Sequence, residues 1–349
     1  MQTEGRTQFR TGLPDLNPAG ARGGIAVVLM NLGTPDRPDP EAVRPYLVEF
    51  LSDPEVISLP RGWRWATPLL ARLIAFFRAK GSAANYAMIW TDRGSPLLSI
   101  SNDQAFALER ELGESARVFV AMRYGRPSLG SVFEEIASEG IHDVVLLPMY
   151  PHYAGPTIGT ALQAAYALLG QTGLRWNVHV LSSWHLFEPY LEAQAAVITR
   201  HLAENHLSPE KSVLLFSAHS MPVSYIRAGD PYQMEVEASI RAISGRLEWP
   251  SDRIRISYQS RLGPVEWLGP STEHVLKELA AKGDRQVAVV PISFTADCVE
   301  TLHEIGIEYR KLFEHELGGK LHLVPALNDD PGFIAALRAL VERTIGGMN

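Results

Sequence analysis

The sequence is poor in cysteine, in long apolar runs and in positive charge. Cys298 is the single cysteine among 349 residues, which excludes an intramolecular disulfide and a zinc or iron–sulfur site built from several cysteines. Acidic residues (39) outnumber lysine and arginine (32), giving a formal net charge of −7, so a broad basic surface for nucleic acid is not expected. No run approaches the roughly 20 apolar residues that span a bilayer. We therefore expect a cytoplasmic protein that is not integral to the membrane.

Familiar nucleotide and hydrolase motifs are also missing. The sequence has no GxGxxG, no Gly-rich phosphate loop and no His-Glu-x-x-His, so dinucleotide, nucleotide and zinc-protease chemistry are weakly supported. Residues 1–23 are polar and rich in Gly and Pro, without an apolar centre. They predict a flexible N-terminal arm and not a secretory signal.

Eight short apolar runs alternate with helix-like stretches, which is typical of buried parallel strands in an α/β fold. These runs cover residues 25–33, 117–125, 143–151, 177–183, 212–220, 254–260, 287–294 and 321–327.

The eight runs form two series that resemble each other. The first run of each series ends in polar residues and a proline ("NLGTP", "SAHSMP"), and the third carries prolines ("LLPMYP", "VVPISF"). We predict two similar α/β domains with four-stranded parallel sheets, at 24–185 and 186–329. The amphipathic helix expected at 330–346 would pack back on the first domain. Alternatively, two unrelated parallel sheets would look alike at this level of detail.

Unusual polar residues fall at or just past the ends of these strands. In open parallel sheets ligands bind beyond the carboxyl ends of the strands, so two facing domains predict a cleft lined by such side chains. The residues at these positions are Asn31, Arg123, Tyr124, Tyr150, His152, His219, Ser260 and Asp297.

Acidic residues recur in the stretch 293–310. Asp297, Glu300, Glu304 and Glu308 would form one stripe on an α-helix capped by Thr295 or by Asp297 itself. Such a stripe could pass protons or a hard divalent cation along the helix. Alternatively, these are acidic residues that favour a helix N-terminus and ordinary exposed glutamates.

His219 stands between two serines in "LLFSAHSMP". It could be a base, a metal ligand or a structural strand-end residue, but it does not belong to a Gly-x-Ser-x-Gly nucleophile elbow. The stretch 60–80 holds two tryptophans and two phenylalanines, and all its charges are positive. It is consistent with a helix lying on a membrane surface or with an ordinary half-buried helix.

Several long stretches resemble the ferrochelatase family, in family order and over roughly residues 25–345. They are "NLGTPDRPDPEAVRPYLVEFLSDPEVISLP", "FSAHSMPVSYIRAGDPY", "YQSRLGPVEWLGPST" and "PISFTADCVETLHEIGIEYR". The resemblance implies a lyase with two Rossmann-like class II chelatase domains. It also implies insertion of Fe²⁺ into protoporphyrin IX to form protohaem, the last step of haem biosynthesis, with release of two protons.

The resemblance also implies site residues by matching position. His219 and Glu300 match the catalytic pair and the metal-contacting groups, and Asp297 and Glu304 match the acidic proton or metal path. The positions that match substrate-binding residues are Asn31, Leu32, Arg123, Tyr124 and Ser260.

Three departures from the family pattern refine these expectations. Ser220 stands where many members have glycine, and Cys298 where animal members have histidine. Leu32 replaces a tyrosine frequent in members that act on coproporphyrin, which favours protoporphyrin IX. The cluster-binding cysteines of animal members are absent, so we expect no iron–sulfur cluster and no permanent cofactor, iron being a substrate.

Other functions remain open at this point. Coproporphyrin III ferrochelatase, another tetrapyrrole metal chelatase, and a non-catalytic haem or porphyrin carrier fit the same fold. The expected partners are protoporphyrin IX and Fe²⁺, with membrane-surface contact through residues 60–80 as a further possibility. We expect a monomer or homodimer, placed in the cytoplasm or peripherally on the inner membrane.

Overall fold

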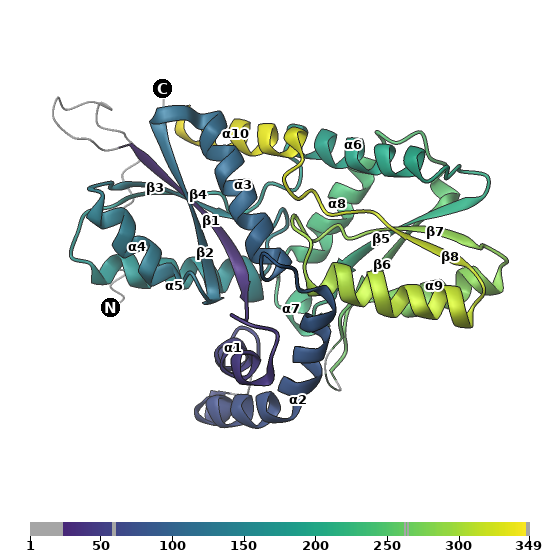
Figure 1. The fold of residues 1–349 in the computed structure, drawn as a ribbon, viewed down its shortest axis with the longest axis horizontal. Helices are drawn as coiled ribbons and strands as arrows, with labels where there is room; N and C mark the ends of the chain where they lie inside the picture. Colours follow the sequence, from purple (N-terminus) through teal and green to yellow (C-terminus); the bar gives the residue numbers. More distant parts are fainter. Residues whose placement is uncertain (1–23, 58–60, 262, 264, 347–349) are drawn as a thin grey trace, which may run out of the picture.

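The computed structural model describes residues 24–57, 61–261, 263 and 265–346 and shows two parallel sheets set side by side (Figure 1). The predicted arm, residues 1–23, lies outside the described residues. Each sheet has four strands, and helices cover their faces. The α/β fold expected from the alternating apolar runs, with two four-stranded parallel sheets flanked by helices, is therefore confirmed, while the domain bounds 24–185 and 186–329 stay a prediction.

The first sheet has the order β2-β1-β3-β4, with every neighbouring pair parallel. Its strands are β1 (Ile25–Thr34), β2 (Ala116–Gly125), β3 (Asp143–Pro148) and β4 (Asn177–Val180). The second sheet repeats the pattern as β6-β5-β7-β8. Its strands are β5 (Ser212–His219), β6 (Ile254–Gln259), β7 (Gln286–Val290) and β8 (Lys320–Leu323). The order of the two sheets thus matches the two series of apolar runs.

Most helices lie on the faces of the sheets. The first half contains α1 (Pro40–Ser52), α2 (Thr67–Ile89), α3 (Pro96–Leu112), α4 (Leu129–Ser138) and α5 (Thr160–Gln171). The second half contains α6 (Glu188–Glu204), α7 (Val223–Arg227), α8 (Tyr232–Ser244), α9 (Thr272–Ala281) and α10 (Pro331–Gly346). Short 3₁₀ or π segments complete the described chain, including η1 (Arg61–Ala66), η3 (Gly155–Gly159), η5 (Val299–Tyr309) and η6 (Leu312–Glu316).

One face of each sheet packs only against helices of its own half, and the other face belongs to a core common to both halves. The strands alternate their side chains, so Val28 of β1 packs with α4 and α5, while Val27 points the other way. Val27 joins a continuous core that also includes Leu214 and Phe216 of β5. Helix α10 packs against both α3 and α6, and so lies across the two halves.

The carboxyl ends of the two sheets meet. Thr295, which follows β7, donates its hydroxyl to the carbonyl of Met149 at the end of β3, at 2.7 Å. Tyr225 of α7 donates to the carbonyl of Glu55, beyond α1, at 2.8 Å. Helices α1 and α2 follow β1 and project from the first sheet, and α2 packs against η5 of the second half. Residues near the strand ends of both sheets therefore share one region.

The acidic segment differs from the expected α-helix. It forms the π-helical segment η5, whose N-cap is Cys298, so Thr295 and Asp297 both precede the helix and do not cap it as predicted. Because a π-helix bonds i to i+5 and is wider than an α-helix, the predicted single stripe from Asp297 to Glu308 does not form. The stretch 60–80 is likewise divided between η1 and α2.

Candidate functional site

His219 ends β5, and its imidazole is half-buried at the carboxyl edge of the second sheet. Its Nδ1 lies 2.6 Å from the carbonyl oxygen of Ser220. Because a carbonyl oxygen can only accept a hydrogen bond, Nδ1 carries the proton in the neutral ring. The lone pair of Nε2 is then available to accept a proton or bind a metal ion.

Glu300 lies in the first turn of η5 among groups that stay protonated. Burial first, and then the nearby Glu300 carboxylate, raise the pKa of the Cys298 thiol well above its usual value. The same two causes contribute to the raised pKa of the buried Tyr46 and Tyr86 hydroxyls, and Glu300 also acts on Tyr150. Glu300 therefore faces phenols supplied by the first half of the chain, which the sequence did not predict.

Gln259 connects the two predicted catalytic residues. It pairs with His219 across β5 and β6, and its side-chain amide donates to the carbonyl oxygen of Glu300 at 2.9 Å. No hydrogen bond or ion pair joins the imidazole to the Glu300 carboxylate, both of which belong to the described residues. The structure places both residues beside Gln259 at the same edge, without linking their side chains directly.

Glu304 has its oxygens occupied by protein donors. It accepts the main-chain N–H of Ser260 at 2.9 Å, the hydroxyl of Tyr309 at 2.8 Å and the amide of Gln259 at 3.0 Å. The hydroxyl of Ser260 is a further donor, and Ser260 adopts a positive φ of 65° at the strand end. These contacts make Glu304 an anchor for the end of β6, and they place Ser260 beside η5.

Asp297 is similarly engaged. Its carboxylate accepts the hydroxyl of Thr301 at 2.8 Å and the side-chain amide of Asn328 at 2.8 Å. Its main-chain N–H donates to the side-chain oxygen of Asn328 at 2.8 Å. Asp297 thereby ties the start of η5 to the loop after β8.

Arg123 and Tyr124, at the end of β2, converge on a residue that sequence reasoning missed. Asp53 Oδ2 accepts from Arg123 Nη2 at 2.5 Å, from the Tyr124 hydroxyl at 2.9 Å and from the Thr160 hydroxyl at 2.5 Å. Burial works to raise the pKa of Asp53, but these donors and the N–H of Glu55 outweigh it, so the pKa is lowered. The sequence signal was modest, because Asp53 only marks the end of α1 in "FLSDP".

The two predicted residues at the end of β1 lie on opposite sides of that strand. Asn31 is buried and donates to the hydroxyl of Ser101 at 2.8 Å. Leu32 is half-buried and packs in a cluster that includes Val299 and Leu302 of η5. Leu32 thus belongs to the apolar contact between the halves, whereas Asn31 is bonded into the first domain.

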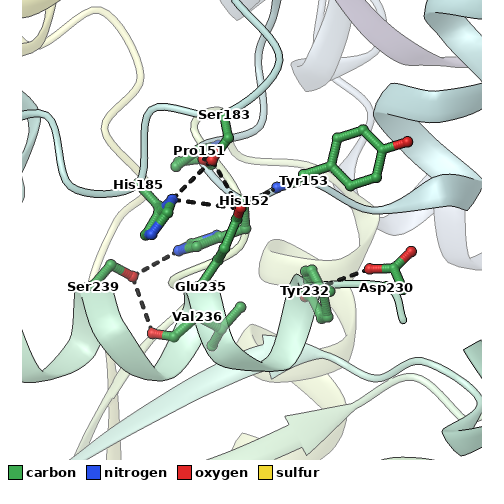
Figure 2. A network of polar contacts seen from close by, with 10 residues as sticks. All are labelled: Pro151, His152, Tyr153, Ser183, His185, Asp230, Tyr232, Glu235, Val236 and Ser239. Atoms are coloured by element: carbon green, nitrogen blue, oxygen red, sulfur yellow. Dashed lines mark hydrogen bonds and ion pairs between the residues drawn. The ribbon is translucent and has the colours of Figure 1, made fainter. Parts of the chain in front are cut away.

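A polar junction joins the halves beside the site (Figure 2), and it contains His152, which the sequence predicted to line the cleft but which is buried between the halves. His152, 2% exposed, places Nε2 2.7 Å from the hydroxyl of Ser239 on α8. Burial first, and then His185, lower the pKa of His152 to about 3. Glu235 of α8 accepts the N–H of Tyr153 at 2.7 Å. This junction fixes α8 against the loop that follows β3.

Among the described residues, no group of three or more His, Cys, Asp or Glu side chains is placed to hold a metal ion. A shallow surface hollow on α6 is lined by Glu188, Glu192, Thr199, Arg200 and Arg246, with two alanines. None of the predicted site residues belongs to that lining, so the hollow is separate from the edge that carries His219.

The sequence match to known proteins decides the family. The ferrochelatase family profile matches residues 24–345. The chain belongs to the ferrochelatase family. The ferrochelatase of Pseudoalteromonas atlantica is 40% identical, over 93% of this chain and 89% of that protein. The ferrochelatase of Thermosynechococcus vestitus is 42% identical, over 91% of this chain and 82% of its own length.

Solved structures support the fold alone. SirB from Bacillus subtilis with Fe³⁺ matches with a TM-score of 0.52 at 15% identity, covering 72% of this chain and 92% of that chain. The sirohydrochlorin chelatase SirB of Bacillus subtilis subspecies spizizenii in complex with cobalt has a TM-score of 0.52 at 11% identity, covering 93% and 96%. The ferrochelatase-family chain thus has the class II chelatase architecture that the resemblance implied.

Proposed function

We propose that the protein is a ferrochelatase that inserts Fe²⁺ into protoporphyrin IX, releasing two protons. The observation that carries the proposal is the hydrogen bond from Nδ1 of His219 to the carbonyl of Ser220. It leaves Nε2 as a free base at the edge where the two halves meet. A histidine base suits this task because its ordinary pKa lies near neutral pH.

A free porphyrin carries two pyrrole N–H protons, and both must leave as the metal enters. In the proposal, Nε2 of His219 has one lone pair and accepts these protons one at a time, releasing each before it takes the next or contacts Fe²⁺. Glu300 accepts the protons from His219 or stabilises the positive charge of the imidazolium. It is suited to this because Gln259 neighbours both residues: it pairs with His219 across the strands and bonds to the main chain of Glu300. His219 and Glu300 are also the groups proposed to contact Fe²⁺, which is a substrate here. We propose no iron–sulfur cluster or other permanent cofactor.

The porphyrin must bend so that its nitrogens point toward the base. Such distortion costs about 1–5 kcal/mol, which binding of the remote ring surface offsets. Leu32, Val299 and Leu302 supply apolar surface from both halves. Arg123, Tyr124 and Asn31, with Ser260, are proposed to bind the substrate as their family positions imply, and Asp297 and Glu304 to shape the proton or metal path by holding η5.

An anaerobic multiple-turnover assay with Fe²⁺ tests the proposal, with protoporphyrin IX and coproporphyrin III run in parallel. We expect turnover with protoporphyrin IX, and faster turnover with coproporphyrin III would reassign the substrate. His219→Ala should lower turnover by about 10²–10⁴-fold, the usual contribution of a general base, while porphyrin binding persists. His274→Ala, which removes an exposed histidine on α9, is the matched control.

Porphyrin that binds without any metal insertion would instead identify a carrier. Equal loss of binding and turnover in His219→Ala would make this histidine structural.

We also propose that α2 and η1 contact a membrane surface, which places the protein in the cytoplasm, peripheral to the inner membrane. Alanines of α2 pack inward while its other face is apolar and exposed. That face consists of Leu69, Leu73, Phe76 and Phe77, continued by Trp63 and Trp65, each at least 55% exposed. Arg72, Arg78 and Lys80 lie exposed on the same helix. No helix in the described part of the chain is long and apolar enough to cross a bilayer.

Sedimentation with phosphatidylglycerol vesicles tests this contact. Phe76→Ser with Phe77→Ser should weaken binding by at least about tenfold, because each buried phenylalanine contributes roughly 1.5–3 kcal/mol. Phe106→Ser is the control, since Phe106 on α3 is 68% exposed but lies outside this face. Equal binding by all variants would leave α2 as an ordinary helix beside the site.

A further inference from the structure

The peptide groups around His219 are held by a closed ring of hydrogen bonds. The main-chain N–H of His219 donates to the hydroxyl of Ser293 at 3.2 Å. The hydroxyls of Ser293 and Tyr232 lie 2.7 Å apart, and Tyr232 donates to the carbonyl oxygen of His219 at 2.8 Å. Each hydroxyl in this ring donates once and accepts once, and such chains strengthen one another.

This ring matters because, among the described residues, no side chain forms a hydrogen bond with the imidazole of His219, whose only aromatic neighbour there is the Phe294 ring, T-shaped to it with the centroids 6.3 Å apart. The hydrogen bond of the imidazole within the described part of the chain runs from Nδ1 to the carbonyl of the next residue, Ser220. A carboxylate commonly fixes the direction of a catalytic histidine, but here the direction follows from the main chain at 219–220. Whatever restricts the peptide groups on both sides of His219 therefore restricts where the imidazole starts, and the Ser220 carbonyl and the Phe294 ring then limit its rotation.

Tyr232 is well placed to transmit rigidity to these peptide groups. It begins α8, is 6% exposed and packs in the core shared by the two halves. The same helix is bonded to the first half through Glu235 and Ser239, and the His152 and Tyr232 rings are T-shaped with their centroids 6.3 Å apart (Figure 2). The hydroxyl at His219 is thus carried by a helix anchored on both halves.

We propose that Tyr232 and Ser293 are positioning residues for metal insertion, which hold Nε2 of His219 toward the substrate through the main chain. This inference rests on the proposed function of His219 as the base. The role assigned to the ring is restriction of the peptide groups on both sides of His219, not contact with substrate or metal. The ring fixes the angle at which the base meets a pyrrole proton.

The test compares Tyr232→Phe with Tyr190→Phe. Both changes delete one hydroxyl from a buried tyrosine of the same core, but the Tyr190 hydroxyl has no hydrogen-bond partner among the described residues. Tyr232→Phe should lower kcat roughly tenfold, in line with the sensitivity of rate to small misplacements, while KM for the porphyrin stays within about twofold. Tyr190→Phe should leave both unchanged. Rates are normalised to binding sites titrated with porphyrin, so that loss of folded protein is not counted as loss of kcat.

A double-mutant cycle with Ser293→Ala tests whether the ring acts as a unit. Opening the ring at either residue should give a similar loss of kcat, and the double variant should lose little more than either single variant. Losses that multiply would show two independent local effects and overturn the ring as the positioning device.

The outcomes separate this inference from the proposed function. An active wild-type protein in which Tyr232→Phe behaves like Tyr190→Phe overturns the positioning role alone. A fall in porphyrin binding parallel to kcat would overturn it as well, since Tyr232 would then only support the fold. A wild-type protein that binds porphyrin but inserts no metal overturns the proposed function, and the role of the ring in that reaction with it.

Discussion

The two halves share a strand order, yet their carboxyl edges are chemically different. In the first half the charged groups neutralise each other, because Arg123 and the Asp53 carboxylate form an ion pair at 2.5 Å. In the second half, no ion pair to Glu300 occurs among the described residues, and Nε2 of His219 keeps its lone pair. Two sheets of the same strand order can therefore have different roles. The carboxyl edge of the first sheet is held by internal bonds, and the carboxyl edge of the second sheet carries the reactive groups.

Removing the charge of Glu300 is the strongest test of this difference between the two edges. Glu300→Gln should lower turnover by about 10³-fold, within the range of a group that transfers protons, with little change in stability. Turnover of Fe²⁺ and the urea midpoint of unfolding are measured together. Glu308→Gln is the control on the same segment, because the Glu308 side chain is 56% exposed. Near-normal rates in Glu300→Gln would remove its role in proton transfer.

The opposite result is expected in the first half. Asp53→Asn leaves Arg123 without its buried partner, so the free energy of unfolding should fall by about 3 kcal/mol at pH 7. Because the folded-state pKa of Asp53 is lowered, its stabilisation is present above the unfolded pKa of about 3.9 and is lost as the pH falls through the folded value. Urea unfolding at pH 7 and below pH 4 measures the difference, and equal stability at pH 7 would contradict it.

Within the second half, Glu304 should behave as a structural group. Glu304→Gln brings an amide to face the donors of Ser260, Tyr309 and Gln259, which should cost about 2 kcal/mol of stability. The thermal midpoint of unfolding should fall while kcat of the folded fraction changes less than in Glu300→Gln. Loss of kcat with unchanged stability would assign Glu304 to the reaction path instead.

The junction between the halves should respond to pH. The pKa of His152 is lowered to about 3, so its neutral form stabilises the fold above the unfolded pKa of about 6.5. That contribution falls by up to about 1.4 kcal/mol per pH unit as the pH drops from 6.5 toward 3. The groups facing His152 are His185, the Tyr232 ring and Ser239, with Glu235 beside them.

His152→Gln should therefore flatten the stability profile between pH 6.5 and 5.5, where the wild type should lose up to about 1.4 kcal/mol more than the variant. His142→Gln, at an exposed position, is the control. Parallel profiles for wild type and His152→Gln would show that this histidine does not titrate with unfolding.

Sequence periodicity was sufficient for the strand pattern, because buried parallel strands are short apolar runs and each one is local in the chain. It also placed His219 at a strand end. It failed at η5, since π-helices are rare and the segment has the pattern of an ordinary amphipathic α-helix. Asp53 was missed for a similar reason, because Arg123 and Thr160 are remote from it in sequence.

The shared apolar face has a consequence for how the molecule comes apart. Val27 of the first sheet and Phe216 of the second belong to one core, and α10 packs on both halves. A fragment ending near residue 185 would expose that face to water, and would lack the last helix that covers α3. The protein should consequently melt in a single cooperative transition, and neither half should persist when it is expressed alone.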